Sequence, residues 1–232
     1  MDYKVDIVMC IDVTGSMQGC IDTVKERAKK FWPDLQEGLK KAKKDVSEVR
    51  VKVLAYRDFS VDADKALQQS EFFRLSDQGS DDDERYKQFL DGLVADGGGQ
   101  IPESSLEILG MAIKDTDWVQ TGDRQRHIII VFTDAPAWKL EDGVGKDNPL
   151  YPKNGPTKME ELSALWMPVG QTGPRTKLKQ AAKRLIIFAP SEQPWTDIRN
   201  SWNQVSGAET EAGSGLDEVK YDEILNAIIG SV

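Results

Sequence analysis

The sequence predicts an α/β protein: a Rossmann-like three-layer sandwich with a mainly parallel central sheet, one short antiparallel edge strand and helices on both faces. Continuous apolar runs of strand length, such as HIIIVF, are typical of strands that are covered on both faces. These runs alternate with longer helical segments, a pattern that predicts βαβ units. A chain of 232 residues, 39% of them hydrophobic, fits a single domain over residues 1–232.

The first predicted elements are three strands and a long helix. The strands are expected at residues 3–11, 49–56 and 70–75, the last of them short and at an edge. Residues 16–42 are expected to form the helix, because apolar residues such as Ile21 and Phe31 recur near the helical spacing. Proline lacks the amide hydrogen that a helix interior needs, so Pro33 is expected to kink or divide this helix.

The remaining elements continue the alternation. Further buried strands are predicted at residues 127–135 and 183–191. Helices are predicted at 81–95, from the glycine-rich turn 97–103 to residue 114, at 195–205 and at 216–229. Residues 139–176 are rich in glycine and proline and are interpreted as an insertion in the domain, with one short helix.

Charge and composition exclude several classes of function. The formal net charge of −9 disfavours phosphate-coated partners, so no nucleic acid is expected. No leader-like or membrane-spanning apolar segment is recognisable, so no membrane contact is expected. The two cysteines, Cys10 and Cys20, do not make a disulfide framework. We therefore expect a cytoplasmic protein.

Oxygen-bearing side chains follow the predicted strands at their carboxyl ends, the edge where open parallel sheets bind ligands. Asp12, Thr14 and Ser16 follow the first strand at alternate positions, and Asp134 follows the run HIIIVF. Glu103 ends the glycine-rich turn, which is expected to lie at the same edge. Carboxylates and hydroxyls without histidine or cysteine indicate a hard cation, which we take to be Mg²⁺, with Mn²⁺ or Ca²⁺ as alternatives.

Each of these residues also has a simpler interpretation. Thr14 or Ser16 can cap the following helix without a metal, and Asp134 can be an ordinary turn residue before a proline. Glu103 can be a favourable charge in the first turn of a helix. Their coincidence at matching strand ends favours a site. The single histidine, His127, lies at the opposite end of its strand and is expected to be structural.

Three elements together resemble the von Willebrand factor type A domain and the metal-ion-dependent adhesion site (MIDAS) of many of its members. They are DVTGS after the first strand, GGGQIPE in the middle and VFTDAP after the central strand. The resemblance in strand order covers nearly the whole chain. It implies that Thr14 and Ser16 coordinate the cation through their hydroxyls. It also implies that Asp12 and Asp134 hold the cation directly or through water, and that Glu103 is the third-loop ligand.

Two residues depart from the family pattern. Thr14 replaces the usual first serine and keeps the hydroxyl. Gln100 stands where the glycine-rich variant of the motif usually has aspartate, so the resemblance does not extend to a second, ancillary cation.

The resemblance implies a divalent-cation-dependent protein-binding module and not an enzyme. The bound Mg²⁺ would accept an Asp or Glu side chain from a partner protein, and the chain would be a standalone intracellular member of bacterial type. One alternative is a metal-dependent phosphotransferase or phosphatase with Asp12 as nucleophile. Haloacid-dehalogenase-type phosphatases have a second acid two residues later, where this chain has Thr14. The other alternative is a metal-free interaction scaffold of the same fold.

Several residues near the predicted metal edge are candidates for partner contacts. They are Gln100 and the aromatic residues Trp138, Tyr151 and Trp166, the aromatic ones because such side chains often anchor partner proteins. The alternative for the aromatic residues is a satellite cluster that seals the insertion onto the domain.

Overall fold

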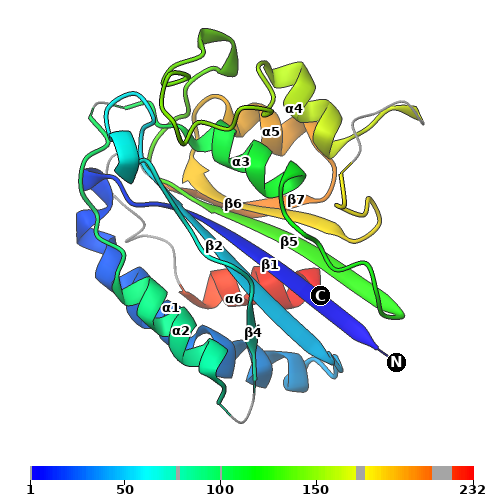
Figure 1. Ribbon diagram of the computed structural model, residues 1–232. Coiled ribbons are helices and arrows are strands. Elements are labelled where there is room, and N and C mark those ends of the chain that lie inside the picture. Colours follow the sequence, from blue (N-terminus) through cyan, green and yellow to red (C-terminus); the bar gives the residue numbers. More distant parts are fainter. Residues whose placement is uncertain (1, 77–78, 100, 171–175, 211–220) are drawn as a thin grey trace.

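The computed structural model describes residues 2–76, 79–99, 101–170, 176–210 and 221–232 (Figure 1). In these ranges seven strands form one sheet in the order β3-β2-β1-β5-β6-β7, with β4 also paired to β2. The strands are β1 (Tyr3–Asp12), β2 (Glu48–Tyr56), β3 (Leu67–Gln69), β4 (Phe73–Leu75), β5 (Arg124–Phe132), β6 (Lys183–Pro190) and β7 (Val205–Thr210). Only β3 and β4 are antiparallel to their neighbour among these strands. The predicted α/β class with a mainly parallel sheet is confirmed.

Helices cover both faces of the sheet, which makes three layers (Figure 1). On one face lie α1 (Gln18–Lys41), α2 (Asp81–Asp91) and α6 (Tyr221–Ser231). On the other lie α3 (Ser105–Lys114), α4 (Met159–Trp166) and α5 (Trp195–Ser201). No helix within the described ranges is long and apolar enough to cross a membrane.

The central strand β1 is buried on both faces. Ile7 and Met9 pack into the core beneath α1, whereas Val8 and Cys10 pack into the core beneath α3. Successive side chains of a strand point to opposite faces of its sheet. A strand covered on both faces therefore has a continuously apolar sequence, which is the pattern that predicts β1.

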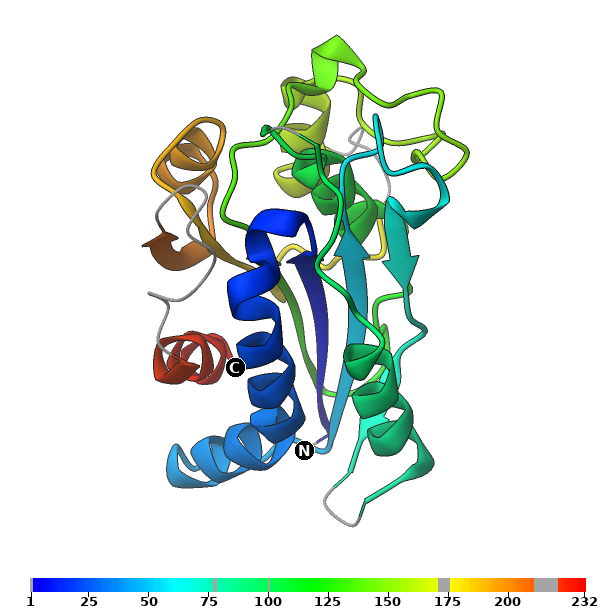
Figure 2. The same cartoon turned by 90° about the vertical axis from the view of Figure 1, so that its left-hand side faces the viewer.

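The structure differs from the predicted elements at the edges of the sheet. Two three-residue strands, β3 and β4, form the antiparallel edge in place of one. The strand β7 was not predicted, because its sequence VSGAET has no continuous apolar run. Of the two outcomes predicted for Pro33, the structure agrees with the kink: Pro33 lies inside an undivided α1, which bends in its C-terminal half (Figure 2). Residues 216–220 of the last predicted helix lie outside the described residues.

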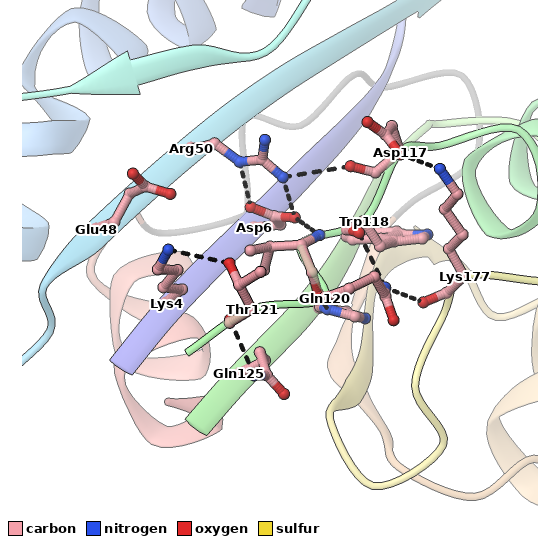
Figure 3. Close-up of polar contacts among 12 residues, drawn as sticks. Lys4, Asp6, Glu48, Arg50, Asp117, Trp118, Gln120, Thr121, Gln125 and Lys177 are labelled. Carbon is pink, nitrogen blue, oxygen red and sulfur yellow. Dashed lines mark hydrogen bonds and ion pairs between the residues drawn. The ribbon is translucent and has the colours of Figure 1, made fainter. Parts of the chain in front are cut away.

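A partly buried ion pair lies near the amino end of β1 (Figure 3), with its acidic residue six positions before Asp12 on the same strand. The fully buried Asp6 carboxylate accepts hydrogen bonds from Nε and Nη2 of Arg50, at 2.8 and 2.7 Å. It also accepts a hydrogen bond from the backbone amide of Val119 at 2.6 Å. Asp6 therefore ties β1 both to β2 and to the loop before β5. The neighbouring pair of Lys177 with Asp117 is exposed.

The single histidine is buried in the same region and has a structural role. The His127 ring stacks on Trp118 with the ring centroids 4.9 Å apart. Its Nδ1 atom accepts a hydrogen bond from the Lys179 amide at 3.2 Å, so the proton belongs to Nε2, which donates to the Val119 carbonyl at 3.0 Å. Burial lowers the pKa of His127, which keeps the ring in this neutral form.

We expect Asp6→Asn to lower the free energy of unfolding by about 2 kcal/mol, because it removes the charge of the carboxylate that accepts the hydrogen bonds of the partly exposed Arg50. Lys177→Ala is the control: it breaks an exposed pair, and its loss should be much smaller. Urea denaturation of both variants measures the two losses. Equal losses would contradict the importance of the pair between Asp6 and Arg50.

Candidate metal centre

The predicted site lies where the carboxyl ends of β1, β2 and β5 meet. β1 pairs with β2 on one side and with β5 on the other, in registers that align Asp12 with Tyr56 and Ile11 with Phe132. Between β2 and β5 the chain crosses from one side of β1 to the other, so the end of β1 is the switch point at which open parallel sheets commonly bind ligands. A backbone hydrogen bond of 3.1 Å from Gly15 to Gly97 joins the loop after β1 to the glycine-rich turn.

Asp12 is fully buried at the end of β1, and its carboxylate organises the loop that follows. Oδ1 accepts hydrogen bonds from the amide and the hydroxyl of Thr14, at 2.9 and 2.6 Å. Oδ2 accepts a hydrogen bond of 2.7 Å from the hydroxyl of Thr133, at the end of β5. Burial raises the pKa of Asp12 to about 6, against the lowering effect of these hydrogen bonds. Since both oxygens have protein donors, Asp12 is suited to hold a cation through an ordered water.

The hydroxyl oxygens of Thr14 and Ser16 lie side by side, 3.2 Å apart. Thr14 donates its proton to Asp12, and Ser16 donates its proton to Oδ1 of Asp134 at 3.0 Å. Lone pairs of both hydroxyls thus remain free to accept. Adjacent oxygen ligands of an octahedral Mg²⁺ ion are about 3 Å apart, given metal–oxygen distances of about 2.1 Å. The two hydroxyls therefore fit neighbouring positions around one hard cation.

Glu103 reaches the site through a backbone connection to the loop after β5. Its amide donates to the Pro136 carbonyl and its carbonyl accepts from the Trp138 amide, both at 2.9 Å, so it forms a parallel bridge with Ala137. Gly98 allows the glycine-rich turn to approach. It has a φ of +86°, and a Cβ atom there would lie 2.5 Å from the Thr14 side chain and 2.9 Å from Oε1 of Glu103. Only glycine fits at this position.

The Glu103 side chain carries the least compensated charge of the site. It is 2% exposed, and its Oε2 atom is buried with no hydrogen-bond partner among the described residues. Its pKa is raised to about 10, first by burial and then by the charges of four nearby carboxylates, those of Asp12, Asp58, Asp62 and Asp134. Because buried charges of one sign repel, Glu103 needs either a proton or a cation.

The residues present fit a hard cation only if the hydroxyls take part. In the part of the chain that the structure describes, no three His, Cys, Asp or Glu side chains form a group that could hold a metal ion. Thr14 and Ser16 supply neutral oxygens, and Asp134 and Glu103 supply carboxylates next to them. Such an all-oxygen set suits Mg²⁺ or Mn²⁺.

Two residues that were not predicted as site residues help to build it. Thr133 fixes the Asp12 carboxylate, as described above. Asp58, which follows β2, is 2% exposed and accepts hydrogen bonds from the Ser60 amide at 2.6 Å and from the Trp138 indole at 2.9 Å. In the sequence only their position could indicate such a role, because each follows directly after a strand that ends at this edge.

The predicted partner-binding residues lie in different environments. Trp138 is half-buried and borders the site through its bond to Asp58. Tyr151 is half-buried, packs edge-on against Phe59 and donates a hydrogen bond of 3.3 Å to Oε1 of Glu107. Both are placed near the loop that follows β2.

Trp166 does not line the site. Trp166 is fully buried, stacks on Trp202 and donates to the Asn203 carbonyl at 2.9 Å. Its predicted place on a binding surface is therefore wrong: it seals α4 onto the core. Gln100 lies outside the described residues.

We expect the protein to bind one Mn²⁺ ion per chain and Ser16→Ala to weaken this binding by about tenfold or more, because it removes one hydroxyl ligand. Ser201→Ala removes an exposed hydroxyl at the end of α5 and serves as the matched control. Titration calorimetry with Mn²⁺ measures the three affinities. An unchanged affinity in Ser16→Ala would rule out its role as a ligand.

Cation binding should strengthen as the pH rises, because the ion must displace the proton that Glu103 retains below about pH 10. Calorimetry in buffers of different ionisation enthalpy measures the protons released when Mn²⁺ binds.

Without a cation, the raised pKa of Glu103 lowers the stability of the fold once the pH exceeds 4.5, the pKa of this group in the unfolded chain. In chelator at pH 8, Glu103→Gln should therefore stabilise the fold by on the order of 2 kcal/mol while it weakens Mn²⁺ binding. The role of Glu103 would be contradicted if Glu103→Gln were less stable than the wild type in chelator and released as many protons as the wild type when Mn²⁺ binds.

Comparison with solved structures supports the fold. Proximal thread matrix protein 1 from the mussel byssus, solved with a zinc-occupied MIDAS motif, is similar with a TM-score of 0.52 at 12% identity over 98% of this chain. The pilus adhesin SpaC from Lactobacillus rhamnosus GG has a TM-score of 0.53 at 12% identity, also over 98% of this chain. This chain spans 46% and 30% of the lengths of those two chains. No protein-family model and no curated protein matches. The comparisons therefore show a Rossmann-like α/β fold, with which a von Willebrand type A-like architecture agrees.

Proposed function

We propose that this chain is a divalent-cation-dependent protein-binding module of the von Willebrand factor A type, whose Mg²⁺ accepts a carboxylate from a partner protein. The observation that carries the proposal is the pair of hydroxyls of Thr14 and Ser16, 3.2 Å apart with both protons directed at carboxylates. Because two of its ligands are neutral hydroxyls, a bound cation would keep more positive charge than it would among carboxylates alone. Its remaining position then favours an anionic oxygen over a carbonyl.

The exposure of the site supports binding of a large partner. Asp12, Glu103 and Asp134 are buried beneath the site, whereas Ser16 is exposed. A partner therefore approaches over Ser16. The chain has a net charge of −9, so an acidic partner side chain is repelled unless a cation lies between the two. The same charge disfavours nucleic acid and anionic membrane surfaces as partners.

The solved relatives support the same kind of role at a distance. One has a MIDAS motif that holds zinc, and the other is an adhesin. The cytoplasmic location and bacterial type that the sequence resemblance implies are part of our proposal, as is the absence of catalytic activity.

The geometry gives less support to the alternative functions. A nucleophilic Asp12 needs an accessible oxygen, yet Asp12 is fully buried and both of its oxygens accept hydrogen bonds. A metal-free scaffold leaves Oε2 of Glu103 buried without a hydrogen-bond partner among the residues that the structure describes. Cation-dependent binding accounts for both observations.

Acetate should bind to the Mn²⁺-loaded protein as a minimal mimic of the partner carboxylate, because it can replace an exchangeable water on the ion. Acetamide, which has the same shape and no charge, is the matched control and should bind far more weakly. The longitudinal relaxation rate of water protons measures the exchange: acetate should lower the Mn²⁺-enhanced rate, and acetamide should not.

Two results would count against the proposed function. An equal effect of acetate and acetamide would show no preference for an anionic oxygen. Turnover of p-nitrophenyl phosphate that depends on Mg²⁺ and is lost in Asp12→Asn would instead support the phosphotransferase.

A further inference from the structure

We propose that the partner segment places large apolar side chains beside its acidic one, an inference that rests on the proposed function. The apolar side chains would pack on an apolar rim formed by Val61 and Ile101 and in a groove next to Val61. The occupant is thus a protein segment with an acidic residue flanked by bulky apolar residues.

Exposed apolar side chains gather at the metal edge. In the described ranges the large apolar residues that stand out as exposed are Val61 (59%), Val94 (59%), Ile101 (53%) and Val169 (86%). The first three lie on the loops that build the metal edge: Val61 follows β2, and the other two lie on the segment between α2 and α3. A gathering of exposed apolar groups around a polar site marks a contact surface for a partner.

The rim is directly connected to the ion ligands. A Cβ atom at Gly99 would lie 3.2 Å from the Val61 side chain, and a Cβ atom at the preceding Gly98 would meet the Thr14 and Glu103 side chains. Ile101 stands two residues before Glu103. Val61 and Ile101 thus belong to the two loops beside the proposed ion site, where the neighbours of a bound carboxylate would meet them.

A preformed groove extends the rim away from the ion. It has a volume of about 470 Å³ and lies between the loop after β2, with Phe59, Val61 and Ala63, and the insertion residues 145–149. The Asn148 amide fixes the two walls, since Nδ2 donates to the carbonyls of Phe59 and Ala63 at 3.0 and 2.8 Å. A groove whose walls are already held in place loses little entropy when a side chain enters it.

The groove and the cation would recognise different parts of the same protein segment. The groove lining contains one basic and one acidic residue, Lys146 and Asp147, so it does not select a charged side chain. Specificity in the groove then comes from apolar contact, and specificity for acid comes from the cation. A segment that combines the two matches both parts of the surface.

Two fluorescein-labelled peptides test the inference, Gly-Gly-Asp-Gly-Gly and Gly-Phe-Asp-Phe-Gly, which have equal charge. In excess Mg²⁺ the phenylalanine peptide should bind about tenfold more tightly by fluorescence anisotropy, because its rings bury apolar area. Val61→Ser and Ile101→Ser should each remove most of this advantage. Both variants should keep the wild-type affinities for Mn²⁺ and for the glycine peptide. Val169→Ser is the matched control and should keep the full advantage.

The outcomes separate this inference from the proposed function. The inference is overturned if the two peptides bind equally, or if the phenylalanine peptide keeps its tighter binding in both Val61→Ser and Ile101→Ser. The proposed function still stands in either case if peptide binding needs Mg²⁺. Binding that persists in chelator, or a wild-type protein that takes up no Mn²⁺, overturns the proposed function. If neither peptide binds the Mg²⁺-loaded protein, both are contradicted.

Discussion

The burial of several carboxylates at one edge of a parallel sheet is the constraint on which the rest of this structure depends. Asp12, Glu103 and Asp134 are each at most 2% exposed, and charges of one sign cannot share a low-dielectric site without compensation. The central place of β1 creates the problem, because loops from both sides of the strand converge above its end. Hydroxyl donors compensate Asp12, but the Oε2 atom of Glu103 has no donor in the described structure.

Backbone contacts hold these loops in place where side-chain charges would push them apart. The bridge between Glu103 and Ala137 fastens the glycine-rich turn to the loop after β5. On the other side, the buried Arg57 guanidinium donates to the carbonyls of Lys65, Val94 and Asp96, at 2.6, 2.5 and 2.7 Å. It thereby joins the loop after β2 to the segment that leads into the glycine-rich turn. The hydrogen bonds that Arg57 makes in the described structure all go to backbone carbonyls of these loops. The negative charge of the buried carboxylates would therefore have to be compensated by a bound cation.

Local patterns in the sequence predict the strands and their ends, and therefore most of the candidate site. The apolar run of β1 and the position of Asp12 just after it are local features, as is the hydroxyl spacing of Thr14 and Ser16. What depends on distant pairing is not predictable in the same way. The short strand β7 is defined by its pairing with β6, and Trp166 is buried because α4 packs over the core. An aromatic residue that binds a partner at the surface and one that packs in the core look the same in the sequence.

The two buried acids of β1 show why we propose a site at the carboxyl edge of the sheet and not at the opposite edge. Asp6 and Asp12 lie on the same strand, six residues apart, and both are fully buried. Around Asp6 the chain supplies its own cation, the guanidinium of Arg50, together with a backbone amide. Around Asp12 it gathers further carboxylates and neutral hydroxyls. A charge that the fold satisfies internally contributes to stability alone, whereas one that it leaves open creates affinity for something outside the chain. The missing positive charge at the Asp12 edge is therefore the physical basis of the binding function that we propose.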